Sequence, residues 1–558
     1  MNVTPPRALR ILAILLAILA VVAYVSYLAI YVYYAVELFR WPFDYDQGEG
    51  FELYDAILYS RGEWPYRDNA SFPFYASNYP PLFHLLIVPL LPIFGPRLIA
   101  GRLLSFVATL ITAATISIVV RRNVREPDQN RMTDWLVPAL SGLGFLASNY
   151  VYQIGPLSRM HMTLVMFETL AIAFIAKFEH PKHGRRNLVL GLTMLFCAGY
   201  TKQTAVFTVA AALSYVFLRD IKKSVISGAA LAIAAGSVFW LINVATDGAW
   251  WLNIIQANVN AFDYRQTLFL FGQWFRLHTL FALLAAGYFV YELFWDRLSA
   301  YSLWFLFALG VGALSGKWGA GFGYFTTAIA SACIASGLAL VRLRGKVEDA
   351  QLRVRRLRFS ARPLLVAMIP LLYLFQVPRM LHLPTSGPVF EPVSRILGVQ
   401  DNLAYGKGDT LARTHCAPVE YYDAMGYTQL GHPLTPRDYA AGAKIMTLVQ
   451  SVEGPVLSEE AMFSILADKP VVTNPTQLLN LYNNGLLDTS EIIDHVNRQV
   501  FDLVIFRAQF YPPPVLQAIG QNYQPADHIC MNGFYYHVLR PNDGSDSGST
   551  LPELASRR

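Results

Sequence analysis

An acidic and aromatic segment follows the first apolar run of this chain and reads FDYDQGEGFELYDAILYSRGEWPYRDN, at residues 43–69. Between positions 37 and 80 the chain has eight acidic residues against three arginines. The preceding run, 11–36, is long enough to span a membrane as a helix and too long for the core of a signal peptide. The sequence therefore predicts an uncleaved anchor that delivers a group of carboxylates to the boundary between lipid and water.

The composition of the whole chain points to a membrane protein. Its 558 residues are 54% hydrophobic and 15% charged, with a mean hydropathy of +0.36. Soluble domains carry about 25% charged residues, so this chain has too few to cover one large soluble enzyme. The same values exclude a disordered protein and predict an α-helical polytopic membrane protein. The formal net charge of +6 would suggest nucleic acid only if the cations gathered on one soluble domain.

Further apolar runs of suitable length follow the anchor, and together they predict about 11 transmembrane helices. They lie near 98–120, 135–153, 160–178, 187–201, 203–218, 224–245, 275–294, 300–315, 323–341 and 363–383. The short run 81–94 contains three prolines, which favours a re-entrant or interfacial helix. We expect the transmembrane part to occupy residues 1–384, with 37–97 as its first outer loop.

The basic residues of the connecting loops predict the orientation. Lys and Arg concentrate in alternate loops, which contain 22 of them with Arg7 and Arg10 included. These loops are 121–131, 177–186, 219–223, 295–297 and 342–362. Short loops rich in Lys and Arg face the cytoplasm, so the opposite loops are expected outside. We therefore expect a plasma-membrane (inner-membrane) protein with a cytoplasmic N-terminus. Its positive net charge comes from the cytoplasmic loops and indicates no nucleic-acid partner.

The C-terminal region has a different pattern. Short β-branched runs at 454–458, 469–473 and 501–506 alternate with helical patterns at 459–467 and 476–487. This alternation predicts a small α/β domain.

We place this α/β domain at 385–540, outside the membrane, followed by a disordered tail at 541–558. No GxGxxG motif supports a dinucleotide site. Cys416 and Cys530 of this region are candidates for one disulfide, whereas Cys197 and Cys333 lie in apolar runs and suit simple packing.

Carboxylates in the first outer loop are candidates for catalysis. Asp44 and Asp46 lie directly after the anchor, and Glu49 follows them. One carboxylate could accept a proton from a hydroxyl or amine, and a second could orient the acceptor or hold Mg²⁺ or Mn²⁺. The alternative is a solvated, charged loop with no catalytic role.

Basic residues near the outer ends of the predicted spans are candidates for anion binding. Ionisable groups at membrane depth are functional hypotheses by default, although each position also suits a residue that reaches for the interface. The candidates are Arg102, Arg159, His161, Lys202 and Lys317. The outer loop 246–274, with Arg265, could reach the same place or serve only as a connector anchored by tryptophans.

The chain resembles the GT-C class of integral-membrane glycosyltransferases, nearest to the protein O-mannosyltransferase-like and aminoarabinose-transferase-like enzymes. The resemblance rests on motifs in a fixed order, no one of them very specific. They are D-x-x-E (Asp46 to Glu49), G-x-x-P-Y-x-D (Gly62, Pro65, Tyr66, Asp68), Y-P-P-L (79–82), F-G (94–95) and G-R-L-L-S (101–105). The resemblance covers residues 10 to about 340 well and the outer domain loosely.

The resemblance implies transfer of a sugar, hexosyl or pentosyl, from a polyprenyl-phosphate donor to a glycan, lipid or protein acceptor on the outer face of the membrane. It carries the base role to Asp46, with Asp44 as the substitute and Glu49 beside them. Donor phosphate binding would fall to Lys202, Lys317, Arg102 and Arg159, with Tyr79, His161, Arg265 and Tyr324 as further substrate-site residues. Many relatives have Asp where this chain has His161, and others have Asn where it has Gly323.

Two other classes of function fit parts of the sequence. A transporter or flippase of lipid-linked sugars would also need membrane-embedded charges, but transporters often show internal repeats and this chain shows none. A non-catalytic assembly subunit would use the α/β domain for binding. Transfer assays and translocation assays separate these classes.

Overall fold

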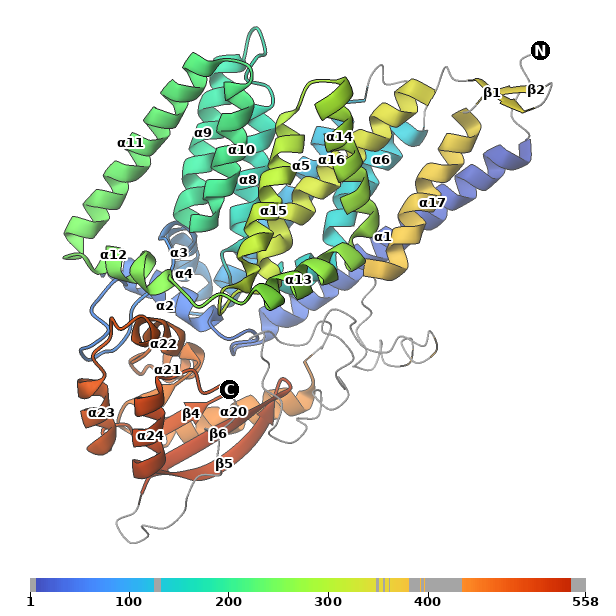
Figure 1. Cartoon of the computed structure of the whole chain (residues 1–558). Helices are drawn as coiled ribbons and strands as arrows, with labels where there is room; N and C mark the ends of the chain where they lie inside the picture. Colours follow the sequence, from blue (N-terminus) through green and yellow to red (C-terminus); the bar gives the residue numbers. More distant parts are fainter. Residues whose placement is uncertain are drawn as a thin grey trace.

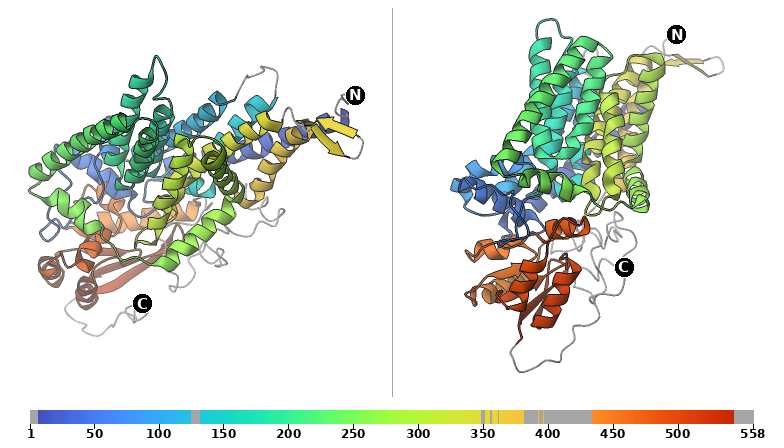
Figure 2. Two further views of the ribbon diagram at one scale, coloured as in Figure 1. Left: turned by 45° about the horizontal axis from the view of Figure 1, so that its top comes forward. Right: turned by 60° about the vertical axis from the view of Figure 1, so that its left-hand side comes forward.

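The computed structural model describes residues 7–124, 132–347, 351–354, 357–360, 362–380 and 434–542, together with positions 392 and 396. A bundle of long helices forms one part of the molecule, and a small α/β domain lies against one end of it (Figures 1 and 2). A two-stranded hairpin, β1 (Gln351–Val354) with β2 (Leu357–Ser360), lies at the opposite end, in the predicted cytoplasmic loop.

Helices occupy the positions of the predicted spans. They are α1 (Arg7–Arg40), α5 (Ile99–Arg122), α6 (Met132–Leu146), α8 (His161–Ile175), α9 (Gly184–Thr201), α10 (Val206–Phe217), α11 (Ile221–Ala245), α14 (Thr279–Trp295), α15 (Ala300–Ala313), α16 (Thr326–Val347) and α17 (Arg362–Met380). In the described part of the chain, four helices are long and apolar enough to span a membrane, in α1, α5, α11 and α16. The pair α13 (Tyr264–Leu277) and α14, bent by 95°, could form a fifth, so the number of spans stays a prediction.

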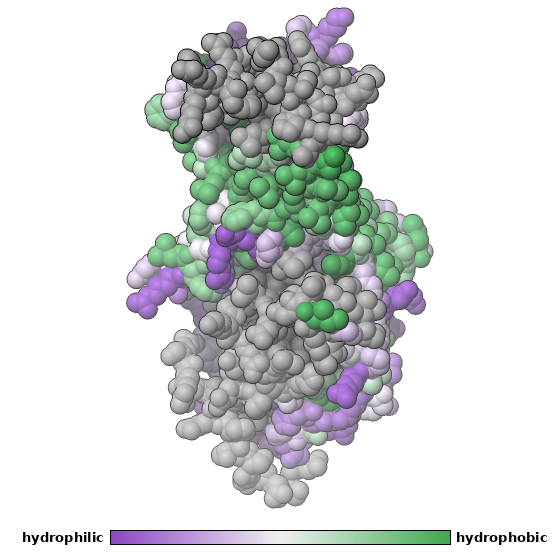
Figure 3. Space-filling model, turned by 90° about the vertical axis from the view of Figure 1, so that its right-hand side faces the viewer, coloured by the Kyte–Doolittle hydropathy of each residue, from purple (hydrophilic) through white to green (hydrophobic). Residues whose placement is uncertain are grey.

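Apolar side chains cover the outside of the helical bundle. On the face drawn in Figure 3 they form a band across the helices, and hydrophilic residues gather beyond it toward the α/β domain. Large apolar side chains also lie exposed along α11, where Ile233 is 68% and Trp240 63% exposed. Apolar surfaces of this kind need a partner other than water, and a bilayer supplies one.

Short helical elements lie at the end of the bundle that faces the α/β domain (Figure 1). They are α2 (Glu49–Ser60), α3 (Leu82–Ile87), η1 (Val88–Leu90), α4 (Leu91–Phe94), α7 (Asn149–Ile154), η2 (Gln203–Ala205), α12 (Ala249–Ile254), η3 (Gln256–Asn258), η4 (Leu314–Gly316) and η5 (Phe322–Phe325). The run 81–94 is a broken helix, because Pro89 and Pro92 occupy the first turns of η1 and α4 and donate no backbone hydrogen bond. The predicted outer loops therefore meet at one end.

The α/β domain contains a four-stranded sheet in the order β3-β4-β6-β5, in which β3 and β4 are parallel and the other pairs antiparallel. Its strands are β3 (Val456–Ser458), β4 (Leu503–Phe506), β5 (Tyr523–Met531) and β6 (Phe534–Pro541). Its helices are α20 (Pro436–Gln450), α21 (Ala461–Leu466), α22 (Pro475–Asn483), α23 (Ser490–Asn497) and α24 (Pro513–Asn522).

The structure corrects the prediction of a strand at 469–473. This run forms no ladder; Val471 and Val472 are buried, and Thr473 makes a single parallel bridge to Phe74 of the first outer loop. The β-branched residues thus pack between the two parts of the molecule. The hairpin β5–β6 was not predicted, because polar residues and Pro525 interrupt its alternation.

Two predicted features fall partly outside the described residues. Cys530 is disulfide-bonded, but Cys416 is not among the described positions. Cys197 and Cys333 are free. Of the predicted tail, only positions 541 and 542 are described, and Pro541 ends β6.

A buried ion pair fastens the first outer loop to the bundle. Arg102, near the start of α5, and Glu49, at the start of α2, are both fully buried. The Nε and one Nη of Arg102 donate to the two carboxylate oxygens of Glu49 at 2.9 and 2.8 Å. Its remaining donors bind three backbone carbonyl oxygens at the end of α1 and just after it, those of Leu38, Trp41 and Phe43.

This geometry does not fit the expectation that Arg102 binds the donor phosphate. A guanidinium has five N–H donors, and protein acceptors use all five here. Arg102 therefore holds the end of α1, the loop and α5 together.

We expect Arg102→Ala to lower the free energy of unfolding by about 3–5 kcal/mol, because it leaves Glu49 as an unpaired buried charge. Arg265→Ala is the matched control: Arg265 is exposed, so its loss should change stability by less than about 0.5 kcal/mol. Thermal unfolding of both variants in detergent measures the difference. Equal stability of the two variants would contradict the structural role of Arg102.

Candidate functional site

Asp46 lies in the loop between α1 and α2 and is 2% exposed. Its carboxylate faces Arg159, with 3.6 Å between Oδ2 and Nε, and Arg159 also reaches Oε1 of Glu52 at 3.4 Å. The neighbouring Gly48 has a φ of 104°, and a Cβ there would lie 2.3 Å from a guanidinium nitrogen of Arg159. The left-handed backbone conformation therefore favours glycine at position 48, beside the guanidinium of Arg159.

Asp44 has a different environment from Asp46. It is fully buried, and it accepts hydrogen bonds from the backbone N–H of Gly50 at 2.5 Å and of Met462 at 3.2 Å. Burial, followed by the nearby Glu460 and Glu49, raises the pKa of Asp44 well above its ordinary value. Asp44 therefore joins the start of α2 to the start of α21 in the α/β domain.

Glu49 is also engaged by the protein itself. Besides Arg102, its carboxylate accepts the backbone N–H groups of Ser158 at 2.7 Å and Tyr45 at 2.9 Å. Burial alone would raise the pKa of Glu49, but the charge and hydrogen bonds of Arg102 hold it below its ordinary value. Among the three predicted acids, Asp46 faces Arg159, whereas Glu49 pairs with Arg102 and Asp44 binds backbone groups.

Lys202 lies in an extended conformation between α9 and η2 and is 4% exposed. Its Nζ is 3.2 Å from Nδ1 of His161, 4.7 Å from the ring centre of Tyr324 and 5.8 Å from that of Tyr79. Aromatic faces attract an ammonium group, but they do not neutralise it. No carboxylate of the described residues lies within 4.0 Å of this Nζ.

The other predicted cations lie near enough to act on Lys202. Burial, followed by the charges of Arg159 and Lys317, lowers the pKa of Lys202 to about 7. Lys317 donates from Nζ to the backbone oxygen of Asn258 at 2.7 Å, so the loop 246–274 does reach this place. The site therefore concentrates positive charge that an anion would stabilise.

Arg265 does not join this group. It lies exposed at the start of α13, and its guanidinium is 6.0 Å from the ring centre of the adjacent Tyr264. The expectation that Arg265 lines the substrate site therefore has no support in its contacts.

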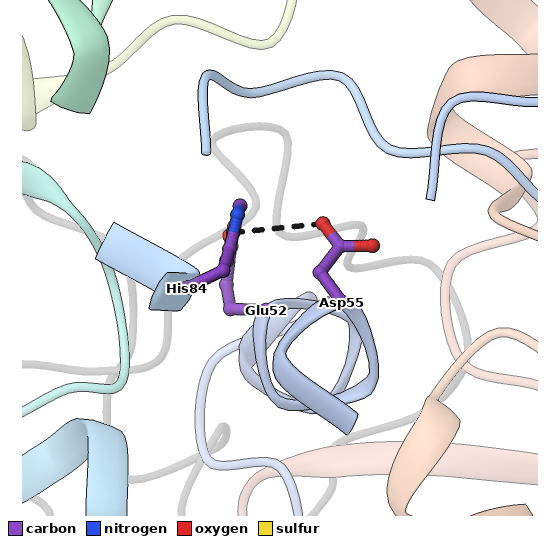
Figure 4. A group of neighbouring side chains, drawn as sticks. All are labelled: Glu52, Asp55 and His84. Carbon is purple, nitrogen blue, oxygen red and sulfur yellow. Dashed lines mark hydrogen bonds and ion pairs between the residues drawn. The ribbon is translucent and has the colours of Figure 1, made fainter. Parts of the chain in front are cut away.

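Glu52, Asp55 and His84 form a buried triad that was not predicted from the sequence (Figure 4). Nε2 of His84 lies 2.6 Å from Oε2 of Glu52 and 3.5 Å from Oδ2 of Asp55, while Tyr75 donates to Asp55. Burial raises the pKa of Asp55 to about 6, and the two carboxylates raise that of His84 against the opposite effect of burial. The spacing of Glu52 and Asp55 on one helix face was the available signal.

Glu168 is a second buried acid that the prediction missed. It lies in α8 and accepts hydrogen bonds from the hydroxyl groups of Thr208 and Thr327, each at 2.7 Å. Trp304 donates to Thr208 in turn, so α8, α10, α15 and α16 share one polar network. A glutamate in an apolar run was a signal for such a network.

The α/β domain closes over the first outer loop from the other side. Asn532 donates to the backbone oxygen of Tyr45 at 3.0 Å, and Gln47 donates to that of Glu459 at 3.5 Å. Arg507 is buried against the ring of Phe534, 3.7 Å from its centre, and pairs with Glu460 at 2.5 Å. The carboxylate-bearing loop therefore lies between the bundle and the α/β domain.

Comparisons with known proteins bear on this arrangement. No protein-family model matches the sequence, and no curated protein matches it. Among solved structures, the chain is similar to ArnT from Cupriavidus metallidurans bound to undecaprenyl phosphate, with a TM-score of 0.55 and 13% identity over 94% of this chain and 99% of that one. The apo state of ArnT gives the same TM-score, at 14% identity over 93% and 97%.

A likeness with a lower TM-score, 0.45, relates the chain to the archaeal oligosaccharyltransferase AglB from Archaeoglobus fulgidus, at 12% identity over 92% of this chain and 74% of that one. ArnT, an aminoarabinose transferase, matches over nearly its whole length, helical bundle and outer domain together. The chain therefore has an ArnT-like fold, which agrees with the resemblance that the order of its motifs predicted.

Proposed function

We propose that this protein is a glycosyltransferase that moves a sugar from a polyprenyl-phosphate donor to an acceptor on the outer face of the membrane. The observation that carries the proposal is the buried ammonium of Lys202, which has aromatic rings and a histidine around it and no carboxylate of the described chain within 4.0 Å. The ArnT structure of the same fold holds undecaprenyl phosphate, which supports a lipid phosphate as the missing anion.

The cations would act on the leaving group. When the sugar departs, the polyprenyl phosphate gains negative charge, and groups already fixed around it lower the barrier because they need not reorganise. Lys202, Arg159 and Lys317 are the residues we assign to this role. A site at the membrane face also keeps the phosphate near the level at which its lipid tail enters the bilayer.

Asp46 is the residue we assign as general base. It would accept the proton of the acceptor hydroxyl or amine as that group attacks the anomeric carbon. Arg159, 3.6 Å away, ties Asp46 to the cation cluster and holds its carboxylate in place. A single displacement inverts the configuration at the sugar. The acceptor is a glycan, a lipid or a protein.

The proposal includes the topology. Residues 1–384 would form the transmembrane catalytic domain of an inner-membrane protein with a cytoplasmic N-terminus, and residues 385–540 would form an extracytoplasmic domain, whose part before 434 lies outside the described residues except for positions 392 and 396. The basic loops, including the β1–β2 hairpin, lie at the end of the bundle opposite the α/β domain, which supports this orientation (Figure 1).

Asp46→Asn should reduce the rate of sugar transfer by about 10²-fold or more, because the amide cannot accept the proton. Asp68→Asn is the matched control, since Asp68 lies exposed in the same loop and bonds only within its own turn. Transfer from synthetic polyprenyl-phosphate sugars by the purified protein measures both rates. Full activity of Asp46→Asn, or translocation of the lipid with no transfer, would contradict the assignment.

Lys202→Met should weaken the binding of undecaprenyl phosphate by about 10–100-fold, the loss expected for one charge-assisted hydrogen bond of about 1.5–3 kcal/mol. Lys182→Met serves as control, because Lys182 is exposed in the loop between α8 and α9, at the other end of the bundle. Calorimetric titration in detergent gives both affinities. Equal affinities would remove Lys202 from the phosphate site.

The triad Glu52, Asp55 and His84 is where we would place a divalent cation, in preference to Asp44, Asp46 and Glu49. One ligand atom from each residue of the triad lies within 4.8 Å of the others, and a set of two carboxylates and one imidazole suits Mn²⁺ or Zn²⁺ better than Mg²⁺. A bound cation would hold α2 against α3, beside the base, and would add positive charge there.

Addition of Mn²⁺ should raise the unfolding temperature of the wild-type protein, by the equivalent of about 2.7 kcal/mol at 100 times the dissociation constant. Glu52→Gln should abolish the rise, and Glu63→Gln, in an exposed position of the same loop, should leave it unchanged. An equal rise in the Glu52→Gln variant, or none in the wild type, would contradict a divalent cation at the triad.

A further inference from the structure

The hydrogen bond between Lys202 and His161 fixes the state of the histidine ring. Once an anion is bound, Lys202 is charged, and an ammonium group has three donors and no acceptor, so Nδ1 of His161, 3.2 Å from Nζ, accepts from it. A ring that accepts at Nδ1 is neutral and carries its proton on Nε2. Lys202 therefore selects the tautomer in which Nε2–H is the donor.

The second nitrogen of His161 makes no hydrogen bond within the described residues, although the ring is only 4% exposed. Gly323, in η5, faces the edge of the ring that carries both nitrogens. A Cβ at Gly323 would lie 2.8 Å from Cε1, 3.0 Å from Nδ1 and 3.3 Å from Nε2. Any side chain at position 323 would thus cover the edge that glycine leaves open.

The surroundings of the ring favour an anion as the partner of this donor. Lys202 is bonded to the ring, Arg159 precedes it by two residues, and both cations disfavour a metal ion at Nε2. A phosphate oxygen accepts hydrogen bonds from neutral and charged donors alike. A neutral N–H beside an ammonium group adds a contact without adding another charge to be compensated.

We propose that Nε2–H of His161 donates a hydrogen bond to the phosphate of the polyprenyl-phosphate donor, and that Gly323 is required because it leaves this edge of the ring uncovered. The proposal rests on the proposed function and assigns to His161 a direct contact with the substrate. No proton leaves the ring in this role: the hydrogen bond forms on binding and shortens as the phosphate gains charge.

Two substitutions of His161 separate contact with the phosphate from support of Lys202. In His161→Gln the side-chain amide reaches the place of Nε2 and can donate there. In His161→Asn the amide reaches the place of Nδ1, so it can accept from Lys202 but cannot replace the Nε2 donor. The full chain is titrated in detergent with undecaprenyl phosphate, and thermal unfolding confirms that each variant is folded.

We expect His161→Gln to bind undecaprenyl phosphate within about threefold of the wild type and His161→Asn to bind about tenfold more weakly, a factor of ten being about 1.4 kcal/mol. Binding by His161→Asn that equals or exceeds that of His161→Gln overturns the proposal. Failure of the wild-type protein to bind undecaprenyl phosphate overturns the proposed function itself. Normal binding by all His161 variants overturns only the contact assigned to His161.

Gly323→Ala tests the same contact without removing any polar group. Gly323→Ala should weaken phosphate binding about tenfold in the wild type. It should have much less effect when His161 is already Asn, because the two substitutions remove the same hydrogen bond from Nε2 of His161. Gly199→Ala is the matched control. Gly199 lies three residues before Lys202, and a Cβ there would meet no atom within 4 Å. A folded Gly323→Ala variant with wild-type affinity contradicts the proposal.

Discussion

The bidentate pair between Arg102 and Glu49 is the constraint on which the rest of this site depends. It is fully buried, and it uses every donor of the guanidinium to join α5, the end of α1 and the start of α2. Glu49 also receives the backbone N–H of Ser158, the residue before Arg159. One carboxylate thus sets the positions of both Asp46 and Arg159, the proposed base and its cation partner.

The site separates structural charges from charges that face a ligand. Asp44, Glu49 and Arg102 have their polar atoms occupied by backbone groups or by one another, and they fasten the loop to the bundle and to the α/β domain. Lys202 differs because its neighbours are aromatic rings and an imidazole. Burial of a charged side chain costs free energy in either case. Asp44, Glu49 and Arg102 recover it from partners within the protein, whereas Lys202 recovers it when an anion binds.

Hydropathy and motif order predicted the helices, the broken run 81–94 and the convergence of the outer loops, because both signals report depth in the membrane. They do not report which way a side chain points around a helix axis. Lys202, His161, Tyr79 and Tyr324 proved to be neighbours, whereas Arg265, at a similar predicted depth, points to solvent. The partners of Arg102 are likewise fixed by packing between distant segments. The departures at His161 and Gly323 face each other in the structure, although they lie far apart in the sequence.

The hydrogen bond from Asn532 to Tyr45 joins residues 487 positions apart in the chain. It fixes the backbone of the loop beside Asp46, and the backbone N–H of Met462 binds the carboxylate of Asp44. During synthesis the loop therefore reaches its place outside the membrane long before its last partners are made. The contacts from the α/β domain to this loop are completed only after β5 has followed, so a ribosome-bound chain with all its transmembrane helices would still lack them.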